Sequence, residues 1–345
     1  MTSTNGDVPG STNGDRPLLE VDGLVVRYPV ARGLTGTLLR HPRQHVHAVS
    51  GVSFTVARGE MVALVGESGC GKTTTAQAVL RLVRPEAGSV RFDGIEVTSL
   101  GARELRRLRR RMQIIYQDPY ESLDPRFRVE TTVAEPLVVH REGSKGERRD
   151  RTVQALELAG LSPPELYLDR YPHELSGGQR QRVAIAASLA LGPELLVADE
   201  PVSMLDVSVR AGILTLLDGL RDSGLAVLMI THDLSTAARF ADRICVMYLG
   251  RIVEEGPAVQ VIEEPQHPYT KALLSVVPRR DPRRQVRPEI LRGETPNPIE
   301  VPSGCRFHPR CPVAVAECRT TDPELRGPVG GAAGSHRAAC ILAGR

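Results

Sequence analysis

Residues 66–73, GESGCGKT, have the composition and spacing of a loop that binds phosphate groups. Its glycines allow consecutive backbone N–H groups to turn inward around an anion, and the helix that follows presents its N-terminus to the same anion. Lys72 would bring a positive charge to the β- and γ-phosphates, and the Thr73 hydroxyl could bind Mg²⁺. A chance glycine turn is disfavoured, because a buried strand precedes the loop and a helix follows it. The candidate nucleotide-binding residues here are Gly66, Ser68, Gly69, Gly71, Lys72, Thr73 and Thr74.

Residues 195–200, LLVADE, supply two carboxylates directly after four apolar residues. Such a strand would be buried in a parallel sheet, and ligands of these sheets bind at the carboxyl ends of the strands. Asp199 could hold Mg²⁺ through water, and Glu200 could polarise an attacking water as a general base. A pair of carboxylates that merely caps a turn is the alternative, and the phosphate loop upstream disfavours it.

The elements that must position these residues can be read from hydrophobic periodicity. Residues 18–28 and 46–56 alternate polar and apolar side chains, which is typical of half-buried antiparallel strands. Residues 60–66, 194–199 and 226–233 are apolar runs, as in strands buried on both faces. We expect helices at the following ranges: 72–83, 207–224 and most of 146–192. Alternating strands and helices predict an α/β fold with a parallel sheet.

Composition limits the remaining possibilities. The chain has 345 residues, 41% of them hydrophobic, which suits about two domains. Its net charge is only +3, so it has no electrostatic footprint for nucleic acid. The arginine-rich segment 103–111 is expected to be a solvated helix face. Residues 1–17 are polar, lack the layout of a signal peptide and are expected to be disordered. No apolar run reaches about 18 residues, so no membrane-spanning helix is expected and the thiols should be in reducing cytosol.

Four cysteines lie close to the end of the chain with the spacing C-x5-C-x6-C-x21-C, at Cys305, Cys311, Cys318 and Cys340. A structural disulfide is disfavoured in reducing cytosol. The spacing lacks the paired C-x2-C units usual in structural zinc sites, and four thiolates on irregular loops suit a [4Fe–4S] cluster. Zinc and four unligated thiols remain alternatives. The two other cysteines, Cys70 and Cys245, are not expected to be ligands.

Residues 175–186, LSGGQRQRVAIA, resemble the signature sequence of ATP-binding cassette (ABC) ATPases. In that family the signature reaches ATP bound to a second subunit, and two cassettes close head to tail around two nucleotides. The resemblance implies that Tyr28 stacks on adenine, that Gln117 contacts Mg²⁺ and the attacking water, that Asp206 crosses the dimer interface and that His232 touches the γ-phosphate. It also implies ATP contacts from four signature residues, namely Ser176, Gly177, Gly178 and Gln179.

Three further segments, 117–126, 264–278 and 304–312, look like the oligopeptide/dipeptide importer subfamily. This resemblance implies a P-loop NTPase ABC nucleotide-binding domain over 18–260, with a mostly parallel sheet core, an antiparallel β subdomain and a helical subdomain at about 118–192. A small Pro/Cys-rich C-terminal domain would occupy 261–345 and hold the [4Fe–4S] cluster. The implied partners are a second ATPase subunit, two integral membrane permeases and, indirectly, an extracytoplasmic solute-binding protein. The protein would lie at the cytoplasmic face of the membrane and use ATP and Mg²⁺.

Several alternative functions are compatible with parts of this pattern. Related importers carry nickel or other small solutes with the same ATPase role. A soluble ABC ATPase of DNA repair or translation is disfavoured, because the chain has one cassette and about a hundred residues between the two halves of the ATP site. A redox-sensing protein with a vestigial cassette is disfavoured by the intact motif residues Lys72, Asp199, Glu200 and His232.

Overall fold

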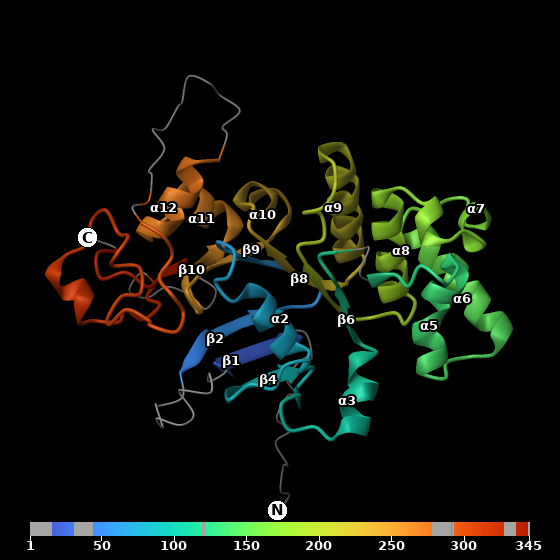
Figure 1. The fold of residues 1–345 in the computed structure, drawn as a ribbon, viewed down its shortest axis with the longest axis horizontal. Helices are drawn as coiled ribbons and strands as arrows, with labels where there is room; N and C mark the ends of the chain where they lie inside the picture. The colour runs from blue at the N-terminus through green and yellow to red at the C-terminus, as the bar shows by residue number, and fades with distance from the viewer. Residues whose placement is uncertain are drawn as a thin grey trace, which may run out of the picture.

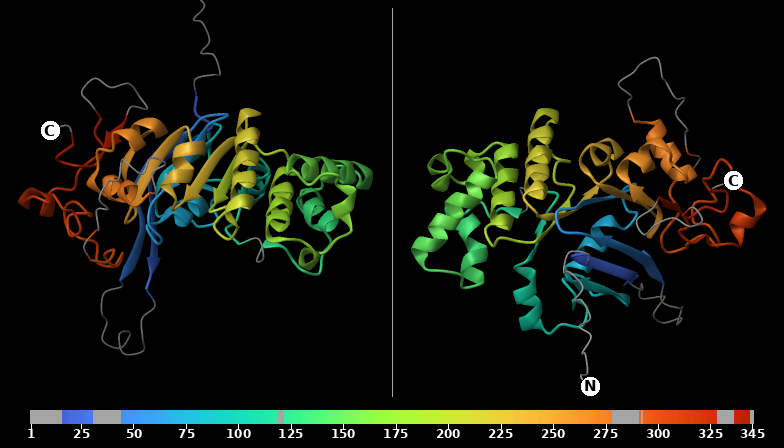
Figure 2. Two further views of the ribbon diagram at one scale, coloured as in Figure 1. Left: turned by 90° about the horizontal axis from the view of Figure 1, so that it is seen from above. Right: turned by 180° about the vertical axis from the view of Figure 1, so that it is seen from behind.

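The computed structural model describes residues 16–30, 44–118, 122–277, 291, 293–327 and 336–343. Most of the N-terminal segment expected to be disordered, residues 1–15, lies outside the described residues. The described chain has three parts along its long axis (Figure 1). Strands and their covering helices lie in the middle, a group of helices lies at one end, and the C-terminal segment lies at the other, as Figure 2 shows from two further sides.

The central sheet has seven strands in the order β11-β10-β9-β3-β8-β7-β6. Strands β9, β3, β8, β7 and β6 run parallel, whereas β10 and β11 are antiparallel additions at one edge. Every residue of β3, β7 and β8 is buried, so the strands expected from continuous apolar runs are confirmed. The bounds are β3 Met61–Val65, β6 Met112–Ile115, β7 Leu195–Asp199, β8 Ala226–Thr231, β9 Arg243–Tyr248, β10 Arg251–Pro257 and β11 Arg337–Ala338.

A second, antiparallel sheet has the order β2-β1-β4-β5. Its long strands pair antiparallel, and Val21, Leu24 and Val26 of β1 are buried between more exposed neighbours. The antiparallel pairing expected from alternating polar and apolar residues is therefore confirmed. The bounds are β1 Leu19–Pro29, β2 His45–Val56, β4 Ala87–Phe92 and β5 Ile95–Glu96. Together with the parallel sheet, this arrangement confirms the mixed α/β fold class.

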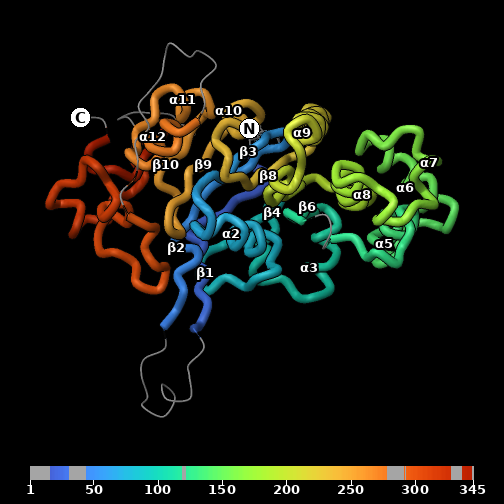
Figure 3. Tube along the Cα trace, turned by 45° about the horizontal axis from the view of Figure 1, so that its top comes forward, coloured from blue at the N-terminus to red at the C-terminus, as the bar shows by residue number. Residues whose placement is uncertain are grey.

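The helices fall into two sets. Helices α5, α6, α7 and α8 form the group at one end of the molecule (Figure 3), while the others lie against or beside the strands. Helix α8 joins this group to the central sheet, because the Ser188 hydroxyl donates a 3.1 Å hydrogen bond to the carbonyl oxygen of Ile114 in β6. The bounds are α2 Lys72–Val79, α3 Ala102–Arg109, α5 Val129–Val139, α6 Lys145–Leu158, α7 Glu165–Leu168, α8 Gly177–Leu189, α9 Val207–Asp222, α10 Leu234–Phe240, α11 Ala258–Glu263 and α12 Pro268–Ser275, with 3₁₀ turns at Pro172–Glu174 and Ala316–Arg319. Among the described residues, no helix is both long and apolar enough to cross a bilayer.

One local expectation from the sequence was wrong. Helix α2 ends at Val79 rather than at residue 83, because Arg81 adopts a left-handed backbone conformation with φ of 52°. The arginine-rich helix α3 does have an exposed face, formed by Arg103, Arg106 and Arg107, and it also has a buried one. Leu105 and Leu108 are buried, and Arg109 donates hydrogen bonds to the carbonyl oxygens of Leu80 (3.0 Å) and Arg81 (2.8 Å). Part of this basic segment therefore holds the end of α2.

The C-terminal segment is joined to the central sheet. Strand β11 pairs antiparallel with β10, so residues more than eighty positions apart become neighbours. The Glu254 carboxylate of β10 has no exposed surface, and it accepts hydrogen bonds from the backbone N–H groups of Gln266 (2.6 Å) and His267 (3.0 Å). His336 Nε2 lies 2.6 Å from the same carboxylate. One buried side chain thus ties the start of α12 and the end of the chain to the sheet.

We expect Glu254→Ala to destabilise the protein by roughly 3 kcal/mol, because it leaves buried donors without an acceptor. The free energy of unfolding of the full chain, measured in urea, tests this. Glu263→Ala is the matched control, because Glu263 is exposed on α11, and it should change the free energy by less than about 0.5 kcal/mol. Equal stability of the two variants would contradict the anchoring role.

Candidate functional site

The phosphate-binding loop runs from the end of β3 to the first residue of α2. Gly71 precedes the helix with φ of 107°, a left-handed conformation that only glycine adopts without strain. A Cβ atom on Gly71 would lie 2.1 Å from the carbonyl oxygen of Ala48, and one on Gly66 would lie 2.1 Å from that of Met247. Neighbouring backbone therefore presses on the loop from outside, and both positions require glycine.

The Lys72 side chain lies across the phosphate-binding loop. Its side chain is buried, and Nζ donates hydrogen bonds to the carbonyl oxygens of Gly66 (2.8 Å) and Glu67 (3.0 Å). The loop residues Ser68 and Gly69 are exposed, and Thr74 is partly buried in the first turn of α2. The loop thus combines a fixed cation with an accessible backbone, which is the arrangement that binds the phosphates of a nucleotide.

The two halves of the predicted site meet at Asp199. The Thr73 hydroxyl donates a hydrogen bond of 3.1 Å to Asp199 Oδ1 at the end of β7. Burial raises the pKa of the Asp199 carboxyl, and the hydrogen bond from Thr73 opposes that rise. A hydroxyl and a carboxylate oxygen this close together are oxygen donors of the kind that Mg²⁺ takes beside a bound phosphate. These two residues therefore fit the predicted ion.

Three strand ends converge on the Glu200 carboxylate. Its Oε2 atom accepts a hydrogen bond of 3.2 Å from Gln117 Nε2, which follows β6, and it lies 3.2 Å from His232 Nδ1, which follows β8. Glu200 itself follows β7 with a left-handed φ of 45°, and its backbone N–H donates to the carbonyl oxygen of Ile230 (3.0 Å). The structure therefore brings together the three side chains expected to act in catalysis.

The signature residues lie on a different part of the chain. Ser176 begins α8, where its hydroxyl accepts a 3.3 Å hydrogen bond from the Gln179 N–H and Gln179 Oε1 accepts one of 2.9 Å from the Ser176 N–H. Gly177 and Gly178 form the first turn, and a Cβ on Gly178 would lie 2.5 Å from Val209 Cγ1. Among the described residues, no hydrogen bond or ion pair joins this helix start to the phosphate loop.

Asp206 and Tyr28 are both exposed. Asp206 precedes α9 without capping it, and Tyr28 lies near the end of β1. Within the described chain, neither side chain reaches the phosphate loop through a hydrogen bond or ion pair. Both side chains are thus open to solvent, and their proposed contacts with a nucleotide or a second subunit stay predictions.

The four C-terminal cysteines line one narrow pocket together with Phe307. None of them forms a disulfide, and the Cys305 N–H donates a 2.9 Å hydrogen bond to the carbonyl oxygen of Cys318. Burial raises the pKa of the Cys305 thiol to about 11 and also raises that of Cys311. Among the described residues, no group of three or more His, Cys, Asp or Glu side chains is arranged to hold a single metal ion. The arrangement of the described side chains therefore supports neither a zinc site nor an iron–sulfur cluster.

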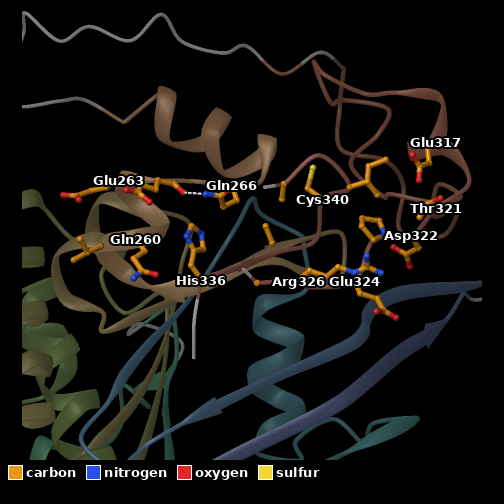
Figure 4. A pocket seen from close by; sticks show the side chains of 17 residues that line it. Gln260, Glu263, Gln266, Glu317, Thr321, Asp322, Glu324, Arg326, His336 and Cys340 are labelled. Carbon is orange, nitrogen blue, oxygen red and sulfur yellow. Dashed lines mark hydrogen bonds between the residues drawn. The ribbon is translucent and has the colours of Figure 1, made fainter. Parts of the chain in front are cut away.

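Cys340 also borders a cavity with a volume of about 800 Å³. Figure 4 shows Cys340 among the residues that line it, which come from α11, from Glu317 to Gly327 and from the end of the chain. No residue predicted to bind ATP lines this cavity. Cys340 thus borders both this cavity and the thiol pocket.

Sequence reasoning missed one part of the site. Glu67 lies inside the phosphate loop, and Arg310, which lies 243 positions later, donates to its carboxylate. Tyr269 of α12 also contacts the loop through its hydroxyl, which accepts a 2.9 Å hydrogen bond from the Glu67 N–H. An acidic residue within an anion-binding loop was the available signal, since it calls for a nearby cation.

We expect Gly71→Ala to destabilise the folded protein by at least about 2 kcal/mol and to abolish ATP binding, because the added Cβ collides with backbone in a strained conformation. Urea unfolding and nucleotide binding of the full chain measure both effects. Gly69→Ala is the control. Its φ is 76°, but the added Cβ meets no atom within 4 Å, so it should cost only about 1 kcal/mol. Equal effects at both positions would rule out the backbone collision.

The chain is similar to known proteins over most of its length. Residues 49–203 match the family model for ABC transporters, and residues 253–318 match that for the oligopeptide/dipeptide transporter C-terminal region. The chain is 48% identical over 313 residues to a Brucella ovis ATP-binding protein named for peptide import, covering 90% of this chain and 95% of that one. It is 46% identical over 310 residues to the dipeptide transport ATP-binding protein DppF of Haemophilus influenzae, covering 90% and 93%.

Among solved structures, the dimeric post-hydrolysis state of the ATP-binding cassette MJ0796 bound to ADP and Pi superposes with a TM-score of 0.61 at 30% identity, covering 70% of this chain and 98% of that chain. The family-model match over residues 49–203 includes the loop, the two acidic residues and the signature. The chain therefore belongs to the ABC transporter ATPases that carry the oligopeptide/dipeptide transporter C-terminal region.

Proposed function

We propose that the protein is the ATP-hydrolysing, energy-coupling subunit of an importer for dipeptides or oligopeptides. The observation that carries this proposal is the Glu200 carboxylate, which lies between Gln117 and His232 at the ends of three neighbouring strands and next to the Thr73–Asp199 pair. This is a set of groups that can hold and activate a water beside a bound phosphate. The relatives are named for peptide import and dipeptide transport, so we propose a peptide as the transported solute.

The proposed chemistry follows from these positions. The backbone of the loop and Lys72 bind the phosphates of ATP, and Mg²⁺, when bound, neutralises phosphate charge during phosphoryl transfer. Thr73, Asp199 and Gln117 are the proposed residues around that ion. Glu200 accepts a proton from the attacking water as a general base, and His232 orients Glu200 and contacts the γ-phosphate. Catalysis then comes mainly from positioning and from charge stabilisation.

We further propose that hydrolysis requires two subunits. Signature residues Ser176 to Gln179 lie at the start of a helix that makes no hydrogen bond or ion pair to the phosphate loop within the described chain, and a helix N-terminus favours phosphate. Asp206 is exposed beside the same region, and exposed Tyr28 is free to stack on adenine. The dimeric cassette bound to ADP and Pi supports this assembly. The second subunit would be another copy or a related ATPase.

For transport, the dimer would act with two integral membrane permeases at the cytoplasmic face of the membrane. An extracytoplasmic solute-binding protein would deliver the peptide to those permeases. The match of residues 253–318 to the oligopeptide/dipeptide transporter C-terminal region supports this assignment. Reconstitution with the permeases followed by ATPase assays with candidate peptides tests it. ATP hydrolysis that peptides and the binding protein leave unchanged would count against peptide import.

We expect Glu200→Gln to reduce ATP hydrolysis by at least roughly 10²-fold while ATP still binds, because the amide keeps the size of the side chain but cannot accept the proton. The variant should also accumulate as an ATP-bound dimer in size-exclusion chromatography. Glu165→Gln, which changes an exposed carboxylate on α7, is the control and should hydrolyse ATP normally. Unimpaired turnover by Glu200→Gln would remove Glu200 from the proposed role.

We also propose that Cys305, Cys311, Cys318 and Cys340 hold a [4Fe–4S] cluster. Each thiolate of such a cluster binds a different iron, so the four sulfurs stand farther apart than around a single ion. The observation behind this proposal is that four thiols without disulfides line one apolar pocket. A short segment with little core of its own would also gain stability from such a group.

Anaerobically purified protein should accordingly be brown and contain roughly four irons per chain. Replacement of all four C-terminal cysteines by Ser should remove both the colour and the iron. Cys245→Ala is the control, because Cys245 is buried in β9 and should not affect the iron content. Colourless, iron-free anaerobic protein would refute the cluster, and stoichiometric zinc in its place would support the closed tetrahedral site instead.

A further inference from the structure

The segment between Cys305 and Cys311 lies directly against the phosphate-binding loop. Arg310 donates hydrogen bonds to both carboxylate oxygens of Glu67, from Nη1 to Oε2 (2.8 Å) and from Nη2 to Oε1 (3.1 Å). The Thr295 hydroxyl adds a 2.8 Å hydrogen bond to Oε2. The Arg310 side chain is only 8% exposed and that of Glu67 is 29% exposed. This two-point contact is therefore a partly buried ion pair, which is stronger than an ordinary surface pair.

Glu67 needs such a partner because of its place in the chain. It is the second residue of a loop that binds phosphate, so an unpaired carboxylate there would repel the phosphates. Burial alone would raise the pKa of the Glu67 carboxyl, but the hydrogen bonds from Arg310 and Thr295 hold it below its ordinary value. Glu67 is thus ionised, and Arg310 supplies the compensating charge.

The same segment supports the loop through aromatic packing. The Phe307 ring lies 5.2 Å from that of Tyr248 in an edge-on arrangement and 5.4 Å from that of Tyr269. Tyr269 in turn accepts the hydrogen bond from the Glu67 N–H, so the position of its ring fixes this backbone group. Phe307, Tyr248 and Tyr269 are all buried. Packing around Phe307 therefore sets the direction in which the loop leaves β3.

Arg306 contacts the other end of the loop indirectly, through two hydrogen bonds. Arg306 donates a 2.5 Å hydrogen bond to the carbonyl oxygen of Leu249, in the turn between β9 and β10. The next residue, Gly250, donates its N–H to the carbonyl oxygen of Cys70 within the loop (2.8 Å). Three side chains of one short segment, at positions 306, 307 and 310, thus contact the loop or its supporting residues at both of its ends.

We propose that Arg310 is a positioning residue for ATP binding, which acts through Glu67 to hold the phosphate-binding loop in its binding conformation. This inference rests on the proposed function, since it concerns the same ATP site. It makes the C-terminal segment part of the nucleotide site, although no residue of that segment is proposed to touch the nucleotide. Loss of Arg310 leaves a partly buried carboxylate beside the phosphates and weakens their binding.

Equilibrium binding of ATP–Mg to the purified full chain tests the proposal. Arg310→Ala should raise the Kd about tenfold, within the range that charge-assisted hydrogen bonds supply. In ATPase assays, KM should rise by a similar factor while kcat changes less than about threefold, because the loop binds ground and transition states alike. Arg310→Lys, which keeps the charge but not the two-point contact, should lie between Arg310→Ala and the unmodified chain.

Arg319→Ala is the matched control, because it removes an exposed arginine from the same C-terminal segment. It should leave the Kd and KM unchanged. The decisive variant is the double change Glu67→Gln with Arg310→Ala. Removing the negative charge should restore binding to within about threefold of the unmodified chain, as coupled residues show in a double-mutant cycle. A purely structural loss in the C-terminal segment would not be rescued in this way.

The outcomes separate this inference from the proposed function. Failure of the unmodified chain to bind ATP would overturn the proposed function together with this inference. Normal binding by Arg310→Ala, or a double variant as weak as Arg310→Ala, would overturn only the role of Arg310. Thermal unfolding of each variant shows whether it is folded, and Arg310→Lys together with the double variant keeps the test decisive where Arg310→Ala fails to fold.

Discussion

A phosphate-binding loop must present its backbone N–H groups to the phosphates, and for this it is rich in glycine. It therefore has few side chains that could pack and fix its shape. Its shape is therefore imposed from outside. Strand β3, buried at every residue between β8 and β9, fixes where the loop begins. Backbone carbonyls of Ala48 and Met247 press on Gly71 and Gly66, where no Cβ would fit. Both sheets thus contribute to one turn of eight residues, which explains why strands so far apart in the chain must assemble before the site exists.

The distribution of charge around the loop follows from the same requirement. Three carboxylates lie in or beside the loop: Asp199 and Glu200 at the end of β7, and Glu67 within the loop itself. Two cations accompany them. Lys72 donates to the carbonyl oxygen of Gly66 in the loop, and Arg310 forms an ion pair with Glu67. Burial raises the pKa of Asp199, whereas the hydrogen bonds from Arg310 and Thr295 lower that of Glu67, so the two carboxylates differ in whether a neighbouring cation compensates their burial.

Features encoded by residues close together in the chain could be predicted from the sequence, whereas contacts between residues far apart in the chain could not. Strands β3, β7 and β8 were predictable because burial on both faces leaves a local apolar run, and the loop and the Asp199–Glu200 pair because their spacing is local. The pairing of β11 with β10 and the contact from Arg310 to Glu67 were not, because no local pattern encodes partners 82 or 243 residues apart. The early end of α2 depends on one left-handed residue, Arg81, which periodicity does not show.

The two ends of the molecule are proposed to serve different nucleotides. The helical end carries α8, whose N-cap is Ser176, and within the described chain this helix start makes no hydrogen bond or ion pair to the phosphate loop, as the proposed contact with a nucleotide on a second subunit requires. The C-terminal end is joined to the sheet through Glu254 and to the loop through Arg310, so it is suited to the nucleotide of its own subunit. The same segment contacts the β9–β10 hairpin at two places, because β11 pairs with β10 and Arg306 donates to the carbonyl oxygen of Leu249, so a displacement of this segment would strain contacts that lead to the loop. The thiol pocket lies in that segment, and a group held there would therefore stabilise the position of Arg310 as well as the fold around it.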